Sequence, residues 1–272
     1  MNERTEQFKT PEPITVHVEI GKGTVTVTAT ETTETTVLVS GKHADQVRVD
    51  QTGRGVSVVE PRRLGFGDDV HVTATVPTGS TLSLITGSAD IEATGIFAGG
   101  SVKSGSGDVR LDHLTESAVL ETGSGDITVS ATDADLKVKS GSGDLRVGRV
   151  GGAITVSTGS GDIEIGESVG EASAKTGSGD LRIGRAGDSV SLMTGSGDLS
   201  VDSMSRGRLS MKSSSGDVRV GIPSGTPVWT DVSSLTGRIS SNLAGVGAPE
   251  EGADYVELRA KTVTGDVVLT QV

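Results

Sequence analysis

Gly105-Ser106-Gly107-Asp108 is the first of six copies of the tetrapeptide Gly-Ser-Gly-Asp, which follow one another at a constant step of about 18 residues. Asp90 extends the series upstream, and Asp217, Arg238 and Asp266 continue it in that order, after steps that grow longer each time. A period this constant is typical of stacked structural units, so we expect about ten rungs. The aspartates of the six copies are Asp108, Asp126, Asp144, Asp162, Asp180 and Asp198.

Apolar and polar residues alternate on both sides of each repeated aspartate. The first and third positions after it are aliphatic in every copy, as in Leu181 and Ile183. The eighth and sixth positions before it are also apolar, as in Val190 and Leu192 before Asp198. This pattern is typical of short strands with one buried face. Each repeat therefore predicts two strands joined by Gly-Ser-Gly, where glycine permits positive φ.

Composition supports an all-β chain built as a parallel β-solenoid, a single-stranded β-helix with about 18 residues per rung. The chain has 40 glycines but only one Trp, one Tyr and three Phe, so its core must consist of small aliphatic side chains. A helical bundle is excluded because Gly and β-branched residues occupy the positions where helices favour Ala, Leu, Glu and Lys.

The ends of the chain depart from the repeat. Residues 1–10 are expected to be a flexible N-terminus, and residues 11–80 an irregular β-sandwich-like N-terminal cap with alternating runs and regular turns. The regular solenoid is expected over residues 81–221, followed by C-terminal rungs over 222–272 with a loop insertion at about 243–253.

Two terminal features suggest contacts with other molecules. The loop of residues 61–69 mixes apolar and charged side chains and is a candidate contact tip. No capping segment follows the last predicted strand, which leaves a sheet edge open. We therefore expect a possible homo-oligomer, in the simplest case a homodimer, through the C-terminal edge.

Charge and cysteine content limit the partners. The net charge of −12 opposes binding to nucleic acid or to an anionic membrane surface. Without cysteine the chain has no disulfide, thiolate zinc site or catalytic thiol. It also lacks a secretory apolar run and any stretch of about 18 apolar residues, which predicts no direct membrane insertion and a cytoplasmic location. The alternative is the cell surface, reached by a non-obvious export route.

The aspartate column has two interpretations. In the first, each carboxylate accepts hydrogen bonds from backbone amides of the adjacent Gly-rich turn. In the second, the column is a row of cation sites. Calcium-binding solenoids use a nine-residue unit with another glycine spacing, and calcium needs about six oxygen ligands, so the first interpretation is favoured. We predict no metal and no cofactor. The cation column would comprise Asp108, Asp126, Asp144, Asp162, Asp180 and Asp198.

Basic residues recur on every second rung at two positions of the repeat. Like charges on adjacent rungs would repel by about 1 kcal/mol in water, and skipping a rung relieves this repulsion. A solvated face explains the pattern, and the alternative is a stripe that binds a protein partner. The stripe would comprise Arg110, Arg146, Arg182 and Arg219, two residues after the aspartate, and Lys103, Lys139, Lys175 and Lys212, five residues before it.

No pattern indicates catalysis. The histidines His17, His43, His71 and His113 stand alone in the sequence. The glycines lack the following helix or the Gly-Lys-Ser/Thr ending of a nucleotide site, and no nucleophile elbow is present. Uniform charges and few aromatic rings also argue against a sugar-cleaving groove. We predict no catalytic and no cofactor-binding residues, and thus no enzyme.

The opening Thr10-Pro11-Glu12-Pro13-Ile14, the Val76-Pro77-x-Gly79-Ser80 entry and the repeated Gly-Ser-Gly-Asp rungs together resemble the bacterial DUF4097 family, also described as putative adhesin or Toastrack domains. The resemblance implies a β-solenoid without established enzyme activity, and relatives joined to membrane segments are linked to surface adhesion or envelope-stress sensing. We expect a non-enzymatic scaffold or protein-interaction module. The alternatives are a self-assembling filament or oligomer, and an exported adhesin or envelope-stress ligand-binding domain.

Overall fold

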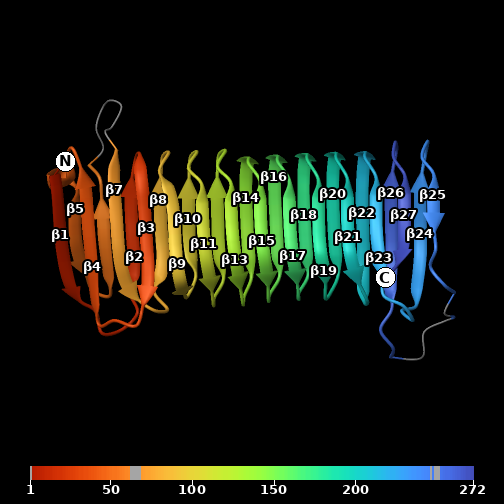
Figure 1. The fold of residues 1–272 in the computed structure, drawn as a ribbon, viewed down its shortest axis with the longest axis horizontal. Helices are drawn as coiled ribbons and strands as arrows, with labels where there is room; N and C mark the ends of the chain where they lie inside the picture. The colour runs from red at the N-terminus through yellow and green to blue at the C-terminus, as the bar shows by residue number, and fades with distance from the viewer. Residues whose placement is uncertain (1, 62–68, 246, 248–251) are drawn as a thin grey trace. The chain divides into compact units, whose positions relative to one another are not determined.

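The computed structural model describes residues 2–61, 69–245, 247 and 252–272. The chain forms two compact units, Met1–Ala134 and Asp135–Val272. Each unit contains strands of two sheets, named sheet A and sheet B (Figure 1). From β7 to the end of the first unit and throughout the second unit, successive strands alternate between the two sheets, and one strand from each sheet makes a rung. The described residues contain one short 3-10 helix, η1 (Ala44–Gln46), and otherwise only strands, turns and loops. The predicted all-β solenoid is confirmed.

The first unit contains the irregular end of the fold. Its sheet A has the order β1-β4-β7-β3-β9-β11-β13, and its sheet B has the order β5-β6-β2-β8-β10-β12. The strands of sheet A are β1 (Asn2–Lys9), β4 (Glu34–Gly41), β7 (Val70–Pro77), β3 (Gly23–Thr30), β9 (Asp90–Phe97), β11 (Val109–Leu114) and β13 (Ile127–Thr132). Those of sheet B are β5 (Arg48–Thr52), β6 (Gly55–Val59), β2 (Thr15–Ile20), β8 (Thr81–Thr86), β10 (Gly100–Ser104) and β12 (Ala118–Thr122).

Most of the N-terminal segment expected to be flexible belongs to sheet A. Residues 2–9 form β1, which pairs antiparallel with β4 along its whole length. Strand β4 would otherwise present an open edge, and its unpaired amides and carbonyls give the N-terminal residues a template for pairing. The guanidinium of Arg4 also donates to the carbonyl of Val47 at 3.3 Å, which holds β1 against the rest of the unit.

The cap expected over residues 11–80 consists of strands from the same two sheets. The rung made by β2 and β3 lies between the β6–β7 rung and the β8–β9 rung, and all of these neighbours run parallel. Among the described strands of this unit, only the pairings that involve β1, β4 and β5 are antiparallel. The proposed contact tip in the loop of residues 61–69 falls mainly on residues 62–68, which lie outside the described residues.

The second unit contains the regular rungs and the C-terminal end. Its sheet A has the order β15-β17-β19-β21-β23-β27-β25, and its sheet B has the order β14-β16-β18-β20-β22-β26-β24. The strands of sheet A are β15 (Leu145–Val150), β17 (Ile163–Ser168), β19 (Leu181–Ala186), β21 (Leu199–Met204), β23 (Val218–Ile222), β27 (Val267–Gln271) and β25 (Ile239–Ser241). Those of sheet B are β14 (Leu136–Ser142), β16 (Ile154–Ser160), β18 (Ala172–Ser178), β20 (Val190–Ser196), β22 (Gly207–Ser215), β26 (Val256–Thr262) and β24 (Val228–Ser234).

The aliphatic columns point into the space between the two sheets, as the alternation predicts. Leu181 and Ile183 of β19 are each 1% exposed, whereas Arg182 between them points to solvent. Leu181 lies in register with Leu199 on the next rung, so equivalent side chains stack on one another. Burial of one such side chain contributes about 1.5–3 kcal/mol, and the stacking repeats this contribution on every rung.

The predicted order of the last rungs is wrong. The sequence suggests the order Asp217, Arg238, Asp266, but the β26–β27 rung lies between the β22–β23 rung and the β24–β25 rung. The inward side chains of β26 are buried and, apart from Thr262, aliphatic, whereas the equivalent positions of β24 include the exposed Thr230 and are otherwise half-buried. The more apolar rung thus takes the interior place. Of the expected insertion at 243–253, residues 246 and 248–251 lie outside the described residues.

The Gly-Ser-Gly corner adopts two conformations. In the second unit the second glycine has positive φ, as at Gly179 with φ 140°, and this agrees with the prediction. Gly107 in the first unit has no positive φ, contrary to the prediction. Both positions nevertheless require glycine. A Cβ added at Gly179 would lie 2.2 Å from the carbonyl oxygen of Gly161, and a Cβ added at Gly107 would lie 2.0 Å from that of Ala89. The close approach of the neighbouring rung therefore selects glycine.

Candidate binding faces of the two sheets

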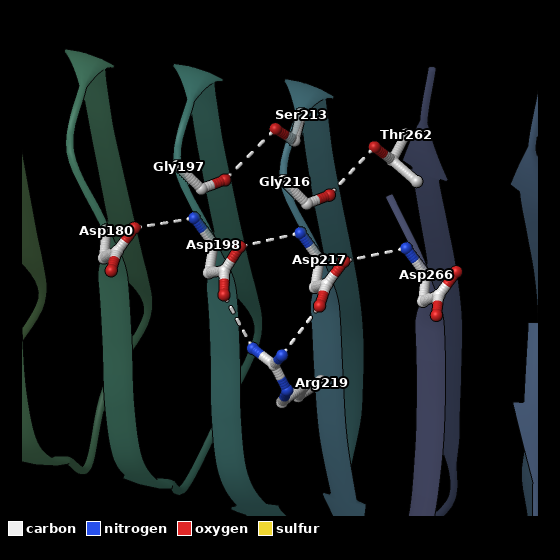
Figure 2. A network of polar contacts seen from close by, with 9 residues as sticks. All are labelled: Asp180, Gly197, Asp198, Ser213, Gly216, Asp217, Arg219, Thr262 and Asp266. Carbon is white, nitrogen blue, oxygen red and sulfur yellow. Dashed lines mark hydrogen bonds and ion pairs between the residues drawn. The ribbon is translucent and has the colours of Figure 1, made fainter. Parts of the chain in front are cut away.

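The repeated aspartates form a hydrogen-bonded ladder from rung to rung. The Oδ1 atom of Asp180 accepts the backbone N–H of Asp198 at 2.7 Å (Figure 2). Asp198 likewise accepts from Asp217 at 2.8 Å, and Asp217 from Asp266 at 2.9 Å. The predicted carboxylate–amide bond is thus present, but its donor is the aspartate of the next rung rather than an amide of the adjacent turn. The ladder ties neighbouring rungs together.

The ladder ends where arginine replaces aspartate. Asp266 accepts the backbone N–H of Arg238 at 2.8 Å, and a guanidinium offers no acceptor for a further rung. In the first unit, Asp90 accepts from Asp108 at 3.0 Å, and Asp108 accepts from Asp126 at 3.1 Å. Among the described residues, no three His, Cys, Asp or Glu side chains gather around a point that could hold a metal ion. This geometry favours the structural interpretation of the column.

The arginines of the predicted stripe lie on the outer face of sheet A, beside the ladder. Arg219 bridges two rungs, because its guanidinium nitrogens lie 2.7 Å from a carboxylate oxygen of Asp198 and 2.7 Å from one of Asp217 (Figure 2). Arg182 lies 2.7 Å from Asp202. Arg146 pairs with Asp144 at 3.2 Å, and in the first unit Arg110 pairs with Asp108 at 3.1 Å. Acidic neighbours on the same sheet therefore neutralise these cations.

These ion pairs shift the ionisation of the ladder. Burial opposes ionisation of Asp198, but hydrogen bonds from the Arg219 guanidinium and the Asp217 amide outweigh it, so the pKa of Asp198 lies below its ordinary value. The hydrogen bond to Asp198 correspondingly raises the pKa of Arg219. Both shifts favour the charged pair.

The lysines of the predicted stripe lie on the other sheet. Lys139, Lys175 and Lys212 belong to β14, β18 and β22 of sheet B, so the eight predicted residues do not form one continuous stripe. Lys103 lies on β10 of the first unit and pairs with Glu121 at 3.1 Å. The sequence places both sets on the outside correctly, but spacing alone does not show that two sheets separate them.

A row of lysines crosses the outer face of sheet B in the second unit. We call Lys139, Lys175, Lys212 and Lys261 the lysine row. Ser157 and Met193 separate the first three lysines on the intervening strands, and every neighbour is paired in register. None of the four ammonium groups forms an ion pair with a described residue. The lysine row therefore carries uncompensated positive charge on a chain of net charge −12.

Lys261 was missed in the sequence, although it also stands five residues before a ladder aspartate, Asp266. The reordered rungs place it directly beside Lys212 in the parallel register of β22 and β26. The other lysines of the row have one intervening rung between them. This pair therefore carries the like-charge repulsion, about 1 kcal/mol in water, that the remainder of the row avoids.

A shallow groove of about 810 Å³ lies on the same face, beside the lysine row. Its floor consists of small hydroxyl side chains on successive strands, and its sides include Arg206, Arg208, Tyr255 and Glu257. The register of β16, β18, β20 and β22 places the floor residues next to one another across the sheet. These floor residues are Thr155, Ser173, Ser191 and Ser210.

An aromatic hollow adjoins the groove. Trp229, Tyr255, Glu257 and Arg259 line it, and Tyr255 and Glu257 also line the groove. The Arg259 guanidinium lies 5.6 Å from the centroid of the Trp229 ring and 2.8 Å from Glu257 Oε1. Arg208 approaches Glu257 Oε2 to 3.0 Å, and this hydrogen bond lowers the pKa of Glu257. The sequence signal was the single Trp and the single Tyr outside the repeat.

The histidines belong to the first unit and lie on separate elements. His17 Nδ1 lies 3.0 Å from Ser83 Oγ, and His71 Nδ1 lies 3.0 Å from Thr24 Oγ1. His113 Nε2 lies 3.0 Å from Asp133. His43 stands at the start of η1. The structure thus brings none of these imidazoles together.

The match to known sequences covers nearly the whole chain. Residues 12–182 and 152–271 match the Toastrack DUF4097 family. The chain belongs to this family. The predicted resemblance is therefore confirmed, and the stacked parallel strands of both units are the Toastrack fold in this protein. No helix among the described residues has the length and apolar character needed to cross a membrane.

Two solved bacterial structures illustrate what this Toastrack protein is similar to. One, described as a "putative lipid binding protein" from Parabacteroides distasonis ATCC 8503, is 12% identical with a TM-score of 0.44, over 100% of this chain and 97% of the other. Another, a "putative adhesin" from Bacteroides fragilis NCTC 9343, is 12% identical with a TM-score of 0.38, over 98% and 97%. No curated protein matches the chain. None of these similarities assigns a ligand to it.

Proposed function

We propose that this chain is a non-enzymatic binding module that docks an acidic segment of a protein partner on the lysine row of its second unit. The single observation that carries the proposal is the row itself. Its four ammonium groups lack ion-pair partners among the described residues, whereas Arg182 and Arg219 on sheet A are paired. A partner rich in carboxylates would supply the missing charge, and a standard interface could include several rungs.

The pair Lys212 and Lys261 supports this proposal. Two unpaired ammonium groups on adjacent strands repel each other, and nothing in the repeat requires lysine at either position, because Ser157 and Met193 occupy the same place on other rungs. Docking of an acidic segment would relieve the repulsion as it forms ion pairs. The two lysines are therefore expected to contribute more to binding than Lys139 at the other end of the row.

The test reverses the charge of the lysine row, and a control variant makes an equal change of charge elsewhere on the chain. The chain is immobilised and incubated with a lysate of its source cells, and captured proteins are identified and then purified for direct binding measurements. Replacement of Lys139, Lys175, Lys212 and Lys261 by Glu should abolish capture and weaken direct binding by at least about 100-fold. The control replaces four lysines of the first unit by Glu, with the same change in net charge: Lys9, Lys22, Lys42 and Lys103.

Equal capture by the row variant and the unmodified chain would reject the lysine row as the binding element. Loss of capture in a control variant that remains folded by circular dichroism would show that net charge, rather than this face, determines binding. Fractionation of the source cells checks the accompanying prediction of a cytoplasmic location. Recovery of the protein at the cell surface would instead favour the exported adhesin or envelope-stress alternative.

A second proposal concerns self-association through the C-terminal end of the second unit. Strands β24 and β25 are the outermost strands there, and each pairs with one described neighbour only. Their inward positions are partly exposed, and Val228, Val232 and Ile239 line a hollow of about 380 Å³. By contrast, the edge strand β1 of the first unit carries four charged residues, Glu3, Arg4, Glu6 and Lys9, which discourage pairing. A second copy could extend sheet B along β24.

Replacement of Thr230 by Pro removes a backbone donor from β24 without changing the buried rungs. We expect multi-angle light scattering to show a dimer for the unmodified chain and a monomer for Thr230→Pro. A monomer for both at high protein concentration would reject self-association. Larger species that grow with concentration would favour the filament alternative.

A further inference from the structure

We propose that the groove on sheet B of the second unit binds a neutral oligosaccharide, with Tyr255 and Trp229 stacking against its sugar rings. This inference does not depend on the lysine row or on a protein partner. It assigns a ligand to the hydroxyl-lined groove and the adjoining aromatic hollow, which together extend from β16 to β24.

The first argument is where the aromatic side chains lie. The chain has one Trp and one Tyr, and both are exposed, Trp229 by 52% and Tyr255 by 47%. The core is built without them, so neither ring is needed to fill it. Two large exposed rings in one hollow mark an interaction site beside a groove whose floor presents small hydroxyl side chains. A sugar ring offers the flat C–H face that such rings bind.

The second argument is that charged groups hold the hollow in place. Glu257 accepts from Arg208 on one side and from Arg259 on the other, and Arg259 stacks over the Trp229 ring. The Glu257 side chain is 19% exposed, so it remains accessible to a ligand while the two arginines hold its orientation. Carboxylates and guanidinium groups each form paired hydrogen bonds with adjacent hydroxyls. The site is therefore organised before a ligand arrives.

The third argument is the groove floor. The hydroxyls of its four Ser and Thr residues form no hydrogen bond with a described residue, although they line up on successive strands. Each is both donor and acceptor, which matches the hydroxyls of a saccharide chain lying across the strands. A lipid tail would leave these hydroxyls unsatisfied, so an acyl chain is disfavoured.

The charge of the groove selects a neutral ligand. Four acidic residues stand against two arginines along its sides, an excess of two negative charges. An anionic polysaccharide would be repelled here, and its natural place would be the lysine row. The acidic residues are Glu171, Asp188, Asp254 and Glu257, and the arginines are Arg206 and Arg208.

The single Trp makes the site observable. Trp229 emission is recorded while the full chain is titrated with cellohexaose, chitohexaose or maltohexaose, and binding is confirmed by calorimetry. We expect a saturable change in emission with at least one of these neutral hexasaccharides. Tyr255→Ala should weaken that binding about tenfold, the loss expected from one stacked ring. Leu235→Ala is the control, because Leu235 is 78% exposed but lines neither the groove nor the aromatic hollow.

A lack of binding for all three hexasaccharides at millimolar concentration would overturn the proposal, and so would binding that Tyr255→Ala leaves unchanged. An acidic hexasaccharide such as hexagalacturonate provides the charge test. If it binds more tightly than the neutral ligands and depends on Tyr255 rather than on Lys212 and Lys261, the neutral assignment of the groove is wrong. Thermal melting of each variant confirms folding, and calorimetry of Trp229→Phe separates loss of the reporter from loss of the ligand.

Discussion

The arginines of sheet A and the lysines of sheet B follow the same rule in the sequence but have different surroundings in the second unit. Each appears on every second rung of the regular region, and Arg219 and Lys212 even share one rung. Arg219 bridges Asp198 and Asp217, whereas Lys212 has no ion-pair partner among the described residues. Equal periodicity in the sequence thus supports two different roles.

The difference arises from what stands next to each cation on its own sheet. A ladder aspartate lies immediately before each strand of sheet A in the regular region. An arginine two residues later therefore reaches a carboxylate on its own rung or on a neighbouring one. On sheet B the equivalent places carry hydroxyls or Met193, and the lysines find no acid among the described residues. The charge of the sheet A arginines is therefore internal to the fold, and the charge of the lysine row on sheet B is available to a ligand.

The largest effect is expected when the charges of Arg219 and Lys212 are reversed in separate variants. Arg219→Glu removes two ion pairs and places a third carboxylate between Asp198 and Asp217. We expect a loss of about 2 kcal/mol in the free energy of unfolding, moderated by the half-exposed position. Lys212→Glu should change stability by less than about 0.5 kcal/mol, because it breaks no ion pair and relieves repulsion from Lys261.

Urea unfolding followed by far-ultraviolet circular dichroism measures both variants. Similar losses in the two would show that the lysine row also supports the fold, and the comparison between the sheets would fail. The reverse pattern in the partner-binding assay sharpens the contrast: Lys212→Glu should reduce capture, whereas Arg219→Glu should leave the partner site intact in the folded fraction.

A smaller effect is expected from a single break in the ladder. Asp180→Ala removes the acceptor of the Asp198 amide and should cost about 1 kcal/mol, the usual net value of such a hydrogen bond. Asp180→Asn retains an oxygen in the same place and should cost less than half as much. Chemical denaturation measures both. If Asp180→Ala and Asp180→Asn lose the same free energy of unfolding, the charge of Asp180 rather than its hydrogen bond stabilises the fold.

Much of this architecture follows from the sequence because it is local and periodic. The alternation around Leu181 and Ile183 predicts both the strands and their buried faces, and the constant step of the repeat predicts the stacking in register. The repeated aspartate also predicts a carboxylate–amide bond. The predicted donor of this bond was wrong, because an amide of the adjacent turn and an amide of the next rung are equally compatible with the spacing.

The features that sequence reasoning missed depend on contacts between distant segments. The β26–β27 rung precedes the β24–β25 rung in space because its side chains are more apolar, and spacing does not reveal this competition. The pairing of Lys212 with Lys261 follows from that reordering. Strand β1 looks too polar for a strand and is stabilised by the backbone edge of β4. Trp229 and Tyr255 stand far apart in the sequence and meet only after the rungs exchange places.

The smallest expected effect is a difference between the two faces in acid. The pKa of Asp198 is lowered in the folded protein, so its ion pair with Arg219 contributes stability above the unfolded-state pKa and loses that contribution as pH falls through the folded-state pKa. Arg219→Met should therefore be less stable than the unmodified chain at neutral pH, and this gap should close at acid pH. Lys212→Met should show no such pH-dependent gap, since Lys212 has no carboxylate partner among the described residues. Urea unfolding midpoints, measured from neutral to strongly acid pH, compare the three proteins. If Arg219→Met remains less stable than the unmodified chain after the carboxylates are protonated, Arg219 stabilises the fold by packing rather than by charge.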